Sequence, residues 1–213
     1  ETLKKFTITG ESPFSMSQLR YYVAIEELYM SSEVTVSSYT AAYSSNVQYV
    51  SSTLKAIYID GDLQDYCEST VSYLTCGTFP IYIKDDNGEY YNLREESVII
   101  VPEGTTKVTN YTFNNFSNLV VYIPASTTIE NNITKYDSSS ESNITNGVVI
   151  ISGATSGTNS SIHYGYSLND VYQTKDYVYL LEKDYTAKIV SVTNRDLVNA
   201  VIPATITVNS QTY

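Results

Sequence analysis

A short pattern, apolar-x-apolar followed by proline or a polar residue, recurs along this chain and constrains its fold more than any other feature. Its best-defined example spans residues 98–124, VIIVPEGTTKVTNYTFNNFSNLVVYIP, where two apolar strands end in Pro102 and Pro124. Successive side chains of a strand point to opposite faces, so the two apolar residues share one face and the residue between them takes the other. Proline cannot donate to a strand ladder and therefore suits a strand's end.

The pattern repeats at intervals of roughly 20 to 30 residues, which is typical of a solenoid. In such a fold no repeat can bury its apolar face alone, and each repeat covers its neighbours. The sequence therefore predicts a mainly β repeat solenoid with a parallel sheet of about seven or eight short strands. The pairs expected to face the core are Leu28/Met30, Ile57/Ile59, Ile81/Ile83, Ile99/Val101, Val121/Ile123, Val149/Ile151, Tyr179/Leu181 and Ala200/Ile202.

The stretch PEGTTKVTNYTFNNFSNLVVYIP resembles the repeat of BspA-like leucine-rich repeat surface proteins. In that family the unit runs from Pro through spaced Val and Ile to Ala-Phe, an apolar residue that is often Cys, and Leu before the next strand. The strands at 25–30, 54–59 and 197–203 keep the three apolar positions of the family, with Ala200 the weakest. Matching positions in the central repeat are Pro102, Val108, Phe113, Phe116 and Leu119, whereas Thr105 and Thr112 depart from the family's Val and Ala.

The resemblance implies a leucine-rich repeat array over residues 25–213, opened by an N-terminal cap over residues 1–24. Irregular, short helical or 3-10 segments would connect the strands. Asn87-Gly88 between alternating residues predicts a β-hairpin within residues 78–95, because a type I′ turn needs positive φ at both central positions. We expect this hairpin to be inserted into the array, and residues 177–192 to form either a repeat strand or a second hairpin. The resemblance also implies a secreted or cell-surface protein whose signal segment has been removed.

Charge and hydropathy exclude several classes of partner. The formal net charge is −11, so a nucleic acid backbone or an anionic membrane surface would be repelled. The sequence contains no apolar run of about 18 residues, so we expect no membrane insertion.

The chain carries no signature of an enzyme or a cofactor site. No nucleophile elbow, zinc-binding helix motif or glycine-rich phosphate loop occurs in the sequence. His163 is the single histidine and falls in a Gly/Ser/Asn-rich segment, where a solvated side chain is the expected role. We therefore expect no catalytic residue and no cofactor.

Two other groups of residues could serve either a binding or a structural role. Asp60, Asp62 and Asp65 suggest a calcium loop, but their spacing fails the ligand pattern, so solvated turn carboxylates are expected and no metal is. Cys67 and Cys76 could close a small disulfide loop in an extracellular protein, or remain two buried free thiols.

The residues between the paired positions carry the functional prediction. All are apolar or aromatic, whereas a solvated sheet face would show polar residues. They are Tyr29, Tyr58, Tyr82, Ile100, Tyr122, Ile150, Leu180 and Val201, of which the first seven are the predicted ligand-binding residues. An apolar ladder on an open face marks a contact surface. The alternative is that these side chains stack to stabilise the sheet, or that loops cover them.

Two function classes follow. The first is a non-enzymatic surface or secreted binding module that offers this sheet face to a protein or glycan, as the resemblance implies for adhesion to host matrix or cell surfaces. The second is a structural spacer within a larger cell-wall protein, with no ligand of its own.

Overall fold

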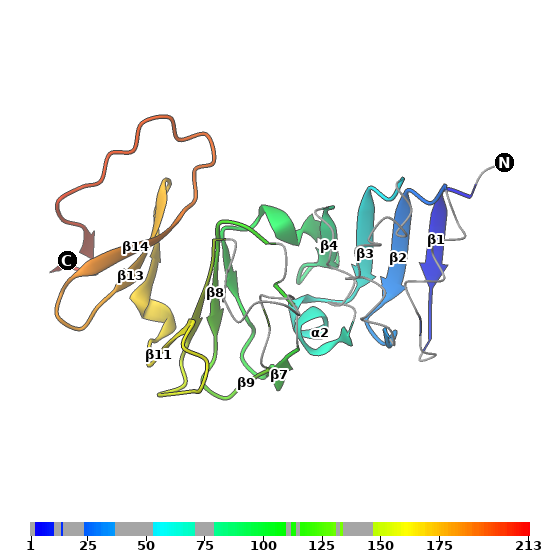
Figure 1. Cartoon of the computed structure of the whole chain (residues 1–213), viewed down its shortest axis with the longest axis horizontal. Helices are drawn as coiled ribbons and strands as arrows, with labels where there is room; N and C mark the ends of the chain where they lie inside the picture. Colours follow the sequence, from blue (N-terminus) through cyan, green and yellow to red (C-terminus); the bar gives the residue numbers. More distant parts are fainter. Residues whose placement is uncertain are drawn as a thin grey trace.

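The chain is mostly β-strands in several small sheets, with little helix (Figure 1). A sheet of four parallel strands with an antiparallel fifth strand and a fully parallel sheet follow one another along an elongated body, and an antiparallel sheet lies at the C-terminal end. The computed structural model describes residues 3–10, 14, 24–36, 53–70, 79–109, 112–113, 116–130, 133 and 147–213.

The first sheet has the strand order β1-β2-β3-β4-β5. The strands are β1 (Lys5–Ile8), β2 (Glu27–Ser31), β3 (Ala56–Asp60), β4 (Ile81–Lys84) and β5 (Tyr90–Asn92). The first four pair in parallel, and β5 turns back antiparallel on β4. The predicted cap therefore contributes β1, the first of the parallel strands, which we call rungs. Residues 1–2, 11–13 and 15–23 of the cap lie outside the described residues.

The second sheet is parallel throughout, with the order β11-β10-β8-β6. Its strands are β6 (Val98–Ile100), β8 (Leu119–Ile123), β10 (Val148–Ser152) and β11 (Ile162–Tyr164). A small parallel ladder of β7 (Lys107–Val108) and β9 (Thr128–Ile129) forms where the chain turns between these rungs. Long-range parallel pairing of this kind joins segments that are about one repeat apart in the sequence.

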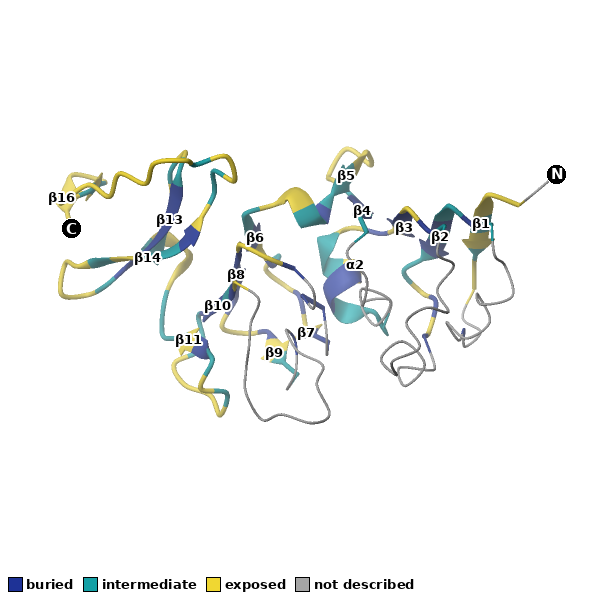
Figure 2. Ribbon diagram, turned by 45° about the horizontal axis from the view of Figure 1, so that its top comes forward, coloured by how far each residue is buried: buried dark blue, intermediate teal, exposed yellow. Residues whose placement is uncertain are grey.

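A single aliphatic core lies beneath both sheets (Figure 2). Five of the predicted pairs have both members buried, at most 3% exposed: Leu28/Met30, Ile57/Ile59, Ile81/Ile83, Ile99/Val101 and Val121/Ile123. The repeat residues Val108 and Phe113 are fully buried in the same core, and the Phe113 and Phe116 rings meet edge to face at 5.9 Å. Because neighbouring rungs share this core, each covers the apolar face of the next.

Helix α2 (Leu63–Glu68) follows β3 in the chain, contacts β4 and β7, and buries Tyr66 and Cys67 in the core. It begins with a capping box, in which Asp62 accepts a hydrogen bond from the Asp65 backbone N–H and Asp65 accepts one from the Asp62 N–H. Its buried Tyr66 donates through its hydroxyl to the Thr112 carbonyl at 2.6 Å, which ties the helix to the neighbouring repeat. The short 3-10 segment η4 (Leu93–Glu95) similarly links β5 to β6.

The predicted hairpin is present, but its turn differs from the type I′ expectation. Gly88 has φ of 82°, whereas Asn87 is not among the residues with positive φ. The Gly88 N–H donates to the Asp85 carbonyl, and the Asp85 N–H donates to the Glu89 carbonyl, both at 2.9 Å. This pattern fits a type I turn followed by a glycine bulge. The Asp85 carboxylate stabilises this turn by accepting hydrogen bonds from the Asn87 and Glu89 N–H groups.

The predicted pair Val149/Ile151 is wrong by one residue. Strand β10 aligns Val148 with Leu119 and Ile150 with Val121, so Val148 and Ile150 face the core, and Val149 and Ile151 take the outward face. A one-residue slip exchanges the two faces of a strand. The run from Val148 to Ile151 is apolar at every position and buried on both sides, so alternation could not define its register.

The C-terminal part is not a continuation of the parallel rungs, which corrects the expectation of one array over residues 25–213. After the 3-10 segment η5 (Leu168–Asp170), an antiparallel sheet with order β12-β13-β14 packs on the outward face of the second sheet. The strands are β12 (Val171–Gln173), β13 (Tyr177–Leu181) and β14 (Ala187–Val192), and a small hairpin of β15 (Thr207–Val208) and β16 (Gln211–Thr212) follows.

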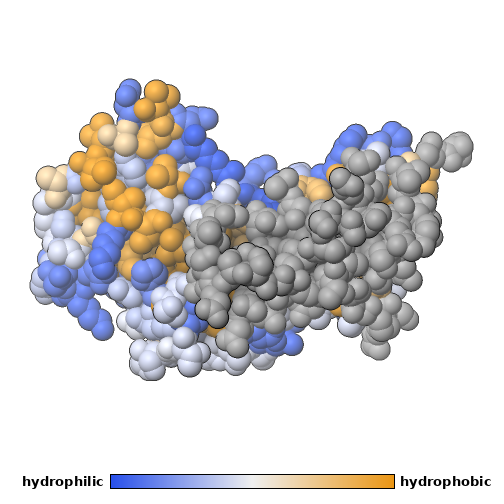
Figure 3. Space-filling view, viewed as in Figure 1, coloured by the Kyte–Doolittle hydropathy of each residue, from blue (hydrophilic) through white to orange (hydrophobic). Residues whose placement is uncertain are grey.

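The last two predicted core pairs are therefore placed differently. Tyr179 and Leu181 are buried against this C-terminal region rather than in the main core. Ala200 and Ile202 lie outside any strand. In this part of the chain, Val198, Val201 and Ile202 are 91%, 76% and 65% exposed. Figure 3 shows apolar residues gathered over this end of the molecule.

Cys67 is a free thiol with no exposed surface, on the buried side of α2. Cys76 lies outside the described residues. Burial raises the pKa of the Cys67 thiol far above its ordinary value, because the thiolate would have to form in an apolar core.

We predict that the Phe113→Ala variant lowers the free energy of unfolding by about 3–5 kcal/mol, because it opens a cavity in the shared core. Chemical denaturation monitored by circular dichroism measures this change. Val198→Ala is the matched control, since Val198 is 91% exposed and its truncation should change stability by less than about 0.5 kcal/mol. A cost below about 1 kcal/mol for Phe113→Ala would contradict the placement of this ring.

We also predict that Cys67 is inert in the folded protein. In a Cys76→Ser variant, a disulfide-exchange reagent should modify no thiol under native conditions and one thiol after unfolding in guanidinium. Rapid modification of the native variant would show that Cys67 is accessible.

Candidate functional site

Three tyrosines stack on the outward face of the first sheet. The ring centroids of Tyr29 and Tyr58 are 4.5 Å apart with an interplanar angle of 7°, and those of Tyr58 and Tyr82 are 4.6 Å apart at 10°. Parallel pairing produces this stack, because it places Tyr29 beside Tyr58 and Tyr58 beside Tyr82 in register. The ring spacing is close to the usual separation of neighbouring strands.

A fourth ring, Tyr90, completes what we call the tyrosine face: Tyr29, Tyr58, Tyr82 and Tyr90. The Tyr90 ring lies edge-on to Tyr58 at 5.4 Å and 81°, and Tyr90 is 39% exposed. Sequence reasoning missed this residue. The predicted hairpin held the signal, because adjacent Tyr90 and Tyr91 on a strand beside β4 must place one ring on each face.

Stacking determines which parts of these rings remain available to a partner. The central ring, Tyr58, has a neighbouring tyrosine against each of its flat faces. The rings of the stack are half-buried. A sugar ring that stacks on either face of Tyr58 would have to displace a neighbouring tyrosine. A surface that packs on ring edges and bonds to hydroxyls would not.

Charged residues fix one end of the stack. Glu27 accepts a hydrogen bond from the Tyr29 hydroxyl at 2.9 Å and forms an ion pair with Lys5 at 2.8 Å. The Lys5 ammonium lies 5.7 Å from the centre of the Tyr29 ring. Hydrogen bonding from Lys5, followed by that from Tyr29, lowers the pKa of Glu27. Burial, followed by the bond to Glu27, raises the pKa of Tyr29, so the phenol stays neutral at physiological pH.

The structure does not bring all seven predicted site residues onto one open face. Ile100 remains accessible, at 47% exposure, but on the second sheet. Tyr122 and Leu180 are buried where the C-terminal sheet covers the second sheet, and Ile150 is in the main core because of the register slip. Strand alternation could not reveal this cover, because the covering strands come from a separate part of the chain.

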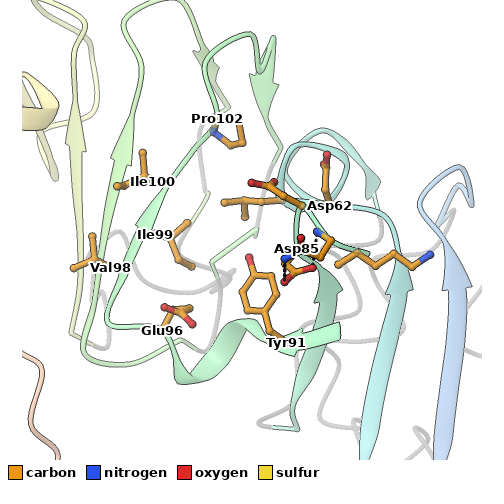
Figure 4. Close-up of a pocket in the computed structure, with 12 residues that line it drawn as sticks. Asp62, Asp85, Tyr91, Glu96, Val98, Ile99, Ile100 and Pro102 are labelled. Carbon is orange, nitrogen blue, oxygen red and sulfur yellow. Dashed lines mark hydrogen bonds between the residues drawn. The ribbon is translucent and has the colours of Figure 1, made fainter. Parts of the chain in front are cut away.

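A cleft of about 580 Å³ opens where the first parallel sheet gives way to the second (Figure 4). The hairpin strand β5 occupies the edge of β4, so β6 begins a new sheet instead of continuing the first. Tyr91 and Ile99 point toward each other across the cleft, and Glu96 lies at one end. Its described lining residues are Asp62, Leu63, Lys84, Asp85, Asp86, Asn87, Tyr91, Glu96, Val98, Ile99, Ile100 and Pro102.

Burial shifts the pKa of two groups in the cleft, Tyr91 and Glu96. Burial raises the pKa of Tyr91 to about 12, and the charge of Glu96 adds to the effect. Burial, followed by repulsion from Glu95, also raises the pKa of Glu96. A cation brought next to Glu96 would stabilise its ionised form.

The aspartates that suggested a calcium loop have structural partners instead. Asp60 forms an ion pair with Lys84, and Asp62 and Asp65 form the capping box of α2. His163 lies in β11 rather than in a loop, is exposed, and meets the Tyr166 ring edge-on at 6.5 Å. Within the described ranges, no group of three or more His, Cys, Asp and Glu side chains is arranged to hold a metal ion.

Comparisons with protein-family models, curated proteins and solved structures found no match. Among the described residues, no helix has the length and apolar character needed to cross a membrane.

We predict that the Tyr29–Tyr58 stack contributes measurably to stability. A double-mutant cycle with Tyr29→Ala and Tyr58→Ala should give a coupling free energy of about 0.5–1.5 kcal/mol, the usual value for an aromatic pair. The control cycle combines Tyr58→Ala with Tyr185→Ala on the C-terminal region, where additivity within about 0.5 kcal/mol is expected. Equal coupling in both cycles would show that the stack is not a specific interaction.

We further predict a loss of stability at high pH that depends on Tyr91. Its pKa is about 12 in the folded chain against an ordinary value of 10.0, so the contribution is complete below about pH 10 and is lost as the pH rises through about 12. The free energy of unfolding of a Tyr91→Phe variant should therefore fall less over this interval than that of the unmodified protein. If the free energies of unfolding of the two proteins fall equally over this pH interval, Tyr91 is not the residue responsible.

Proposed function

We propose that the chain is a non-enzymatic binding module of a secreted or cell-surface protein, and that the tyrosine face is its contact surface for a protein partner. The observation that carries this proposal is the in-register stack of Tyr29, Tyr58 and Tyr82 on a sheet face that no other described strand covers. Tyrosine offers a rigid contact area and a hydroxyl group at low entropic cost, as in antibody paratopes.

A protein suits this surface better than a glycan does. Sugar recognition by stacking needs free ring faces, and both faces of Tyr58, the central ring, contact neighbouring tyrosines. Ring edges, hydroxyl groups and the neighbouring ions Lys5, Glu27 and Lys84 form a mixed apolar and polar surface instead. Binding to a glycan array that exceeds binding to proteins would refute this choice.

The proposed scaffold is a BspA-like leucine-rich repeat array. Two observations support it. The strands of consecutive repeats pair in parallel, and Val108, Phe113 and Leu119 are buried. Pro124 also follows β8 directly, and Pro102 comes two residues after the end of β6. The secreted or cell-surface location, with adhesion as its purpose, rests on the same resemblance. The module would need no cofactor.

A structural spacer is the second candidate, and a specific observation favours it. The tyrosine rings stack on one another, and the C-terminal sheet covers the outward face of the second sheet. Both features stabilise the chain without any ligand. In a spacer, changes to the tyrosine hydroxyls would have no effect on binding because nothing binds.

Two sets of variants separate these functions. The triple variant Tyr29→Phe, Tyr58→Phe, Tyr82→Phe keeps the stacked rings and removes their hydroxyls, and the corresponding serine variant removes both. We predict that on an array of matrix proteins and glycans a protein ligand binds the unmodified chain, binds the phenylalanine variant about tenfold more weakly and fails to bind the serine variant.

Tyr185→Ser is the matched control, because Tyr185 is 60% exposed and lies outside the tyrosine face. It should bind as the unmodified protein does. Circular dichroism and thermal unfolding of every variant separate loss of a contact from loss of the fold. Retention of all binding by a folded serine variant would contradict the proposed surface.

A further inference from the structure

We propose that the cleft between the two parallel sheets binds an extended basic peptide as an added strand along β6. This site is distinct from the tyrosine face, which lies on the outward surface of the first sheet. The inference rests on the free backbone edge of β6, the volume of the cleft and the charge of its lining.

The backbone of β6 turns hydrogen-bonding groups away from its own sheet. On the β8 side, the Ser97 carbonyl accepts from the Val120 N–H and the Val101 N–H donates to the Tyr122 carbonyl, each at 2.9 Å. Alternate residues of a strand bond to the same neighbour, so Ser97, Ile99 and Val101 serve β8. The N–H and C=O groups of Val98 and Ile100 therefore point to the opposite edge, which faces the cleft.

Nothing in the described part of the chain pairs with this edge. Strand β6 stands last in its sheet, and both Val98 and Ile100 line the cleft. An unpaired strand edge is a ready template for another strand, and many proteins recognise extended peptides in this way. The cleft volume of about 580 Å³ lies within the range of sites that bind peptides and other small ligands.

The lining selects the chemistry of the peptide. Its centre is apolar, with Tyr91, Ile99 and Leu63, which suits an apolar side chain pointing inward. Among the described lining residues, four carboxylates stand against one ammonium, that of Lys84, which is paired with Asp60. The carboxylates belong to Asp62, Asp85, Asp86 and Glu96.

Figure 4 shows Glu96 near the start of β6, and Asp62 and Asp85 on the side of the cleft across from the strand. A peptide along β6 would thus meet an apolar centre, with Glu96 near one end and further carboxylates along the opposite wall of the cleft. Lysine or arginine at both ends of a short apolar segment complements this arrangement. The net charge of −11 adds a long-range attraction for such a peptide.

The test uses the whole chain and a fluorescein-labelled peptide of sequence Lys-Thr-Val-Thr-Val-Thr-Lys, with binding followed by fluorescence anisotropy. Two matched peptides accompany it, one with glutamate in place of both lysines and one with N-methylated valines, which cannot donate backbone hydrogen bonds. We expect the basic peptide to bind, and each matched peptide to bind at least about tenfold more weakly. Affinity should also fall as salt rises from about 50 to about 500 mM.

Protein variants test the same contact from the other side. Ile100→Pro removes the edge N–H that faces the cleft and leaves the bonds of Ile99 and Val101 to β8, so it should weaken binding about tenfold or more. Ile100→Thr keeps the N–H and should bind within about twofold of the unmodified chain. The double variant Glu96→Gln, Asp86→Asn should weaken binding and flatten the salt dependence.

Several results would overturn the proposal. They are no binding at about 1 mM peptide, equal binding of the N-methylated peptide, or equal binding of the glutamate peptide. Self-association in sedimentation that Ile100→Pro abolishes would assign the edge to a second copy instead. If Ile100→Pro does not fold, the N-methylated peptide still decides the outcome on the unmodified chain. Loss of binding in the Tyr58→Phe variant would move the site to the tyrosine face.

Discussion

The parallel pairing of short strands over one aliphatic core is the constraint on which the rest of this structure depends. Most of the parallel strands bury two side chains beneath the sheet, and no strand could bury them alone. The core is continuous from Phe14 to Ile162 although the sheet above it is divided by the hairpin. Stacked tyrosines and an open strand edge are both consequences, because in-register pairing aligns the rings and the hairpin ends one ladder before the next begins.

Much of the core could be predicted from the sequence, because alternation identifies the inward residues wherever one face of a strand is polar or aromatic. Ile57 and Ile59 flank a tyrosine, and their burial follows from that pattern alone. Alternation could not resolve β10, where Val148 to Ile151 are apolar without interruption, nor could it distinguish a parallel rung from the antiparallel strand that contains Tyr179. In both cases the arrangement depends on which strands pack against or pair with the segment, and the segment's own residues do not show this.

The candidate site divides in the same way. Tyr29, Tyr58 and Tyr82 could be predicted to form one row, because each takes the middle position of the recurring apolar-x-apolar pattern. The burial of Tyr122 and Leu180 could not, because it depends on the C-terminal sheet folding back on the second sheet. The cleft depends on the turn at Asp85, which places β5 where the next rung would otherwise pair. A single turn thus decides where one ladder ends and where a strand edge stays open.

Native-state hydrogen exchange, followed as a function of denaturant, tests most directly whether one core joins the two sheets. The Ile57 N–H bonds to the Pro80 carbonyl in the first sheet, and the Val120 N–H bonds to the Ser97 carbonyl in the second. If the core is shared, both amides exchange through the same global opening, with equal free energies and equal denaturant dependence. Two distinct opening free energies would show that the sheets unfold separately and would contradict the account.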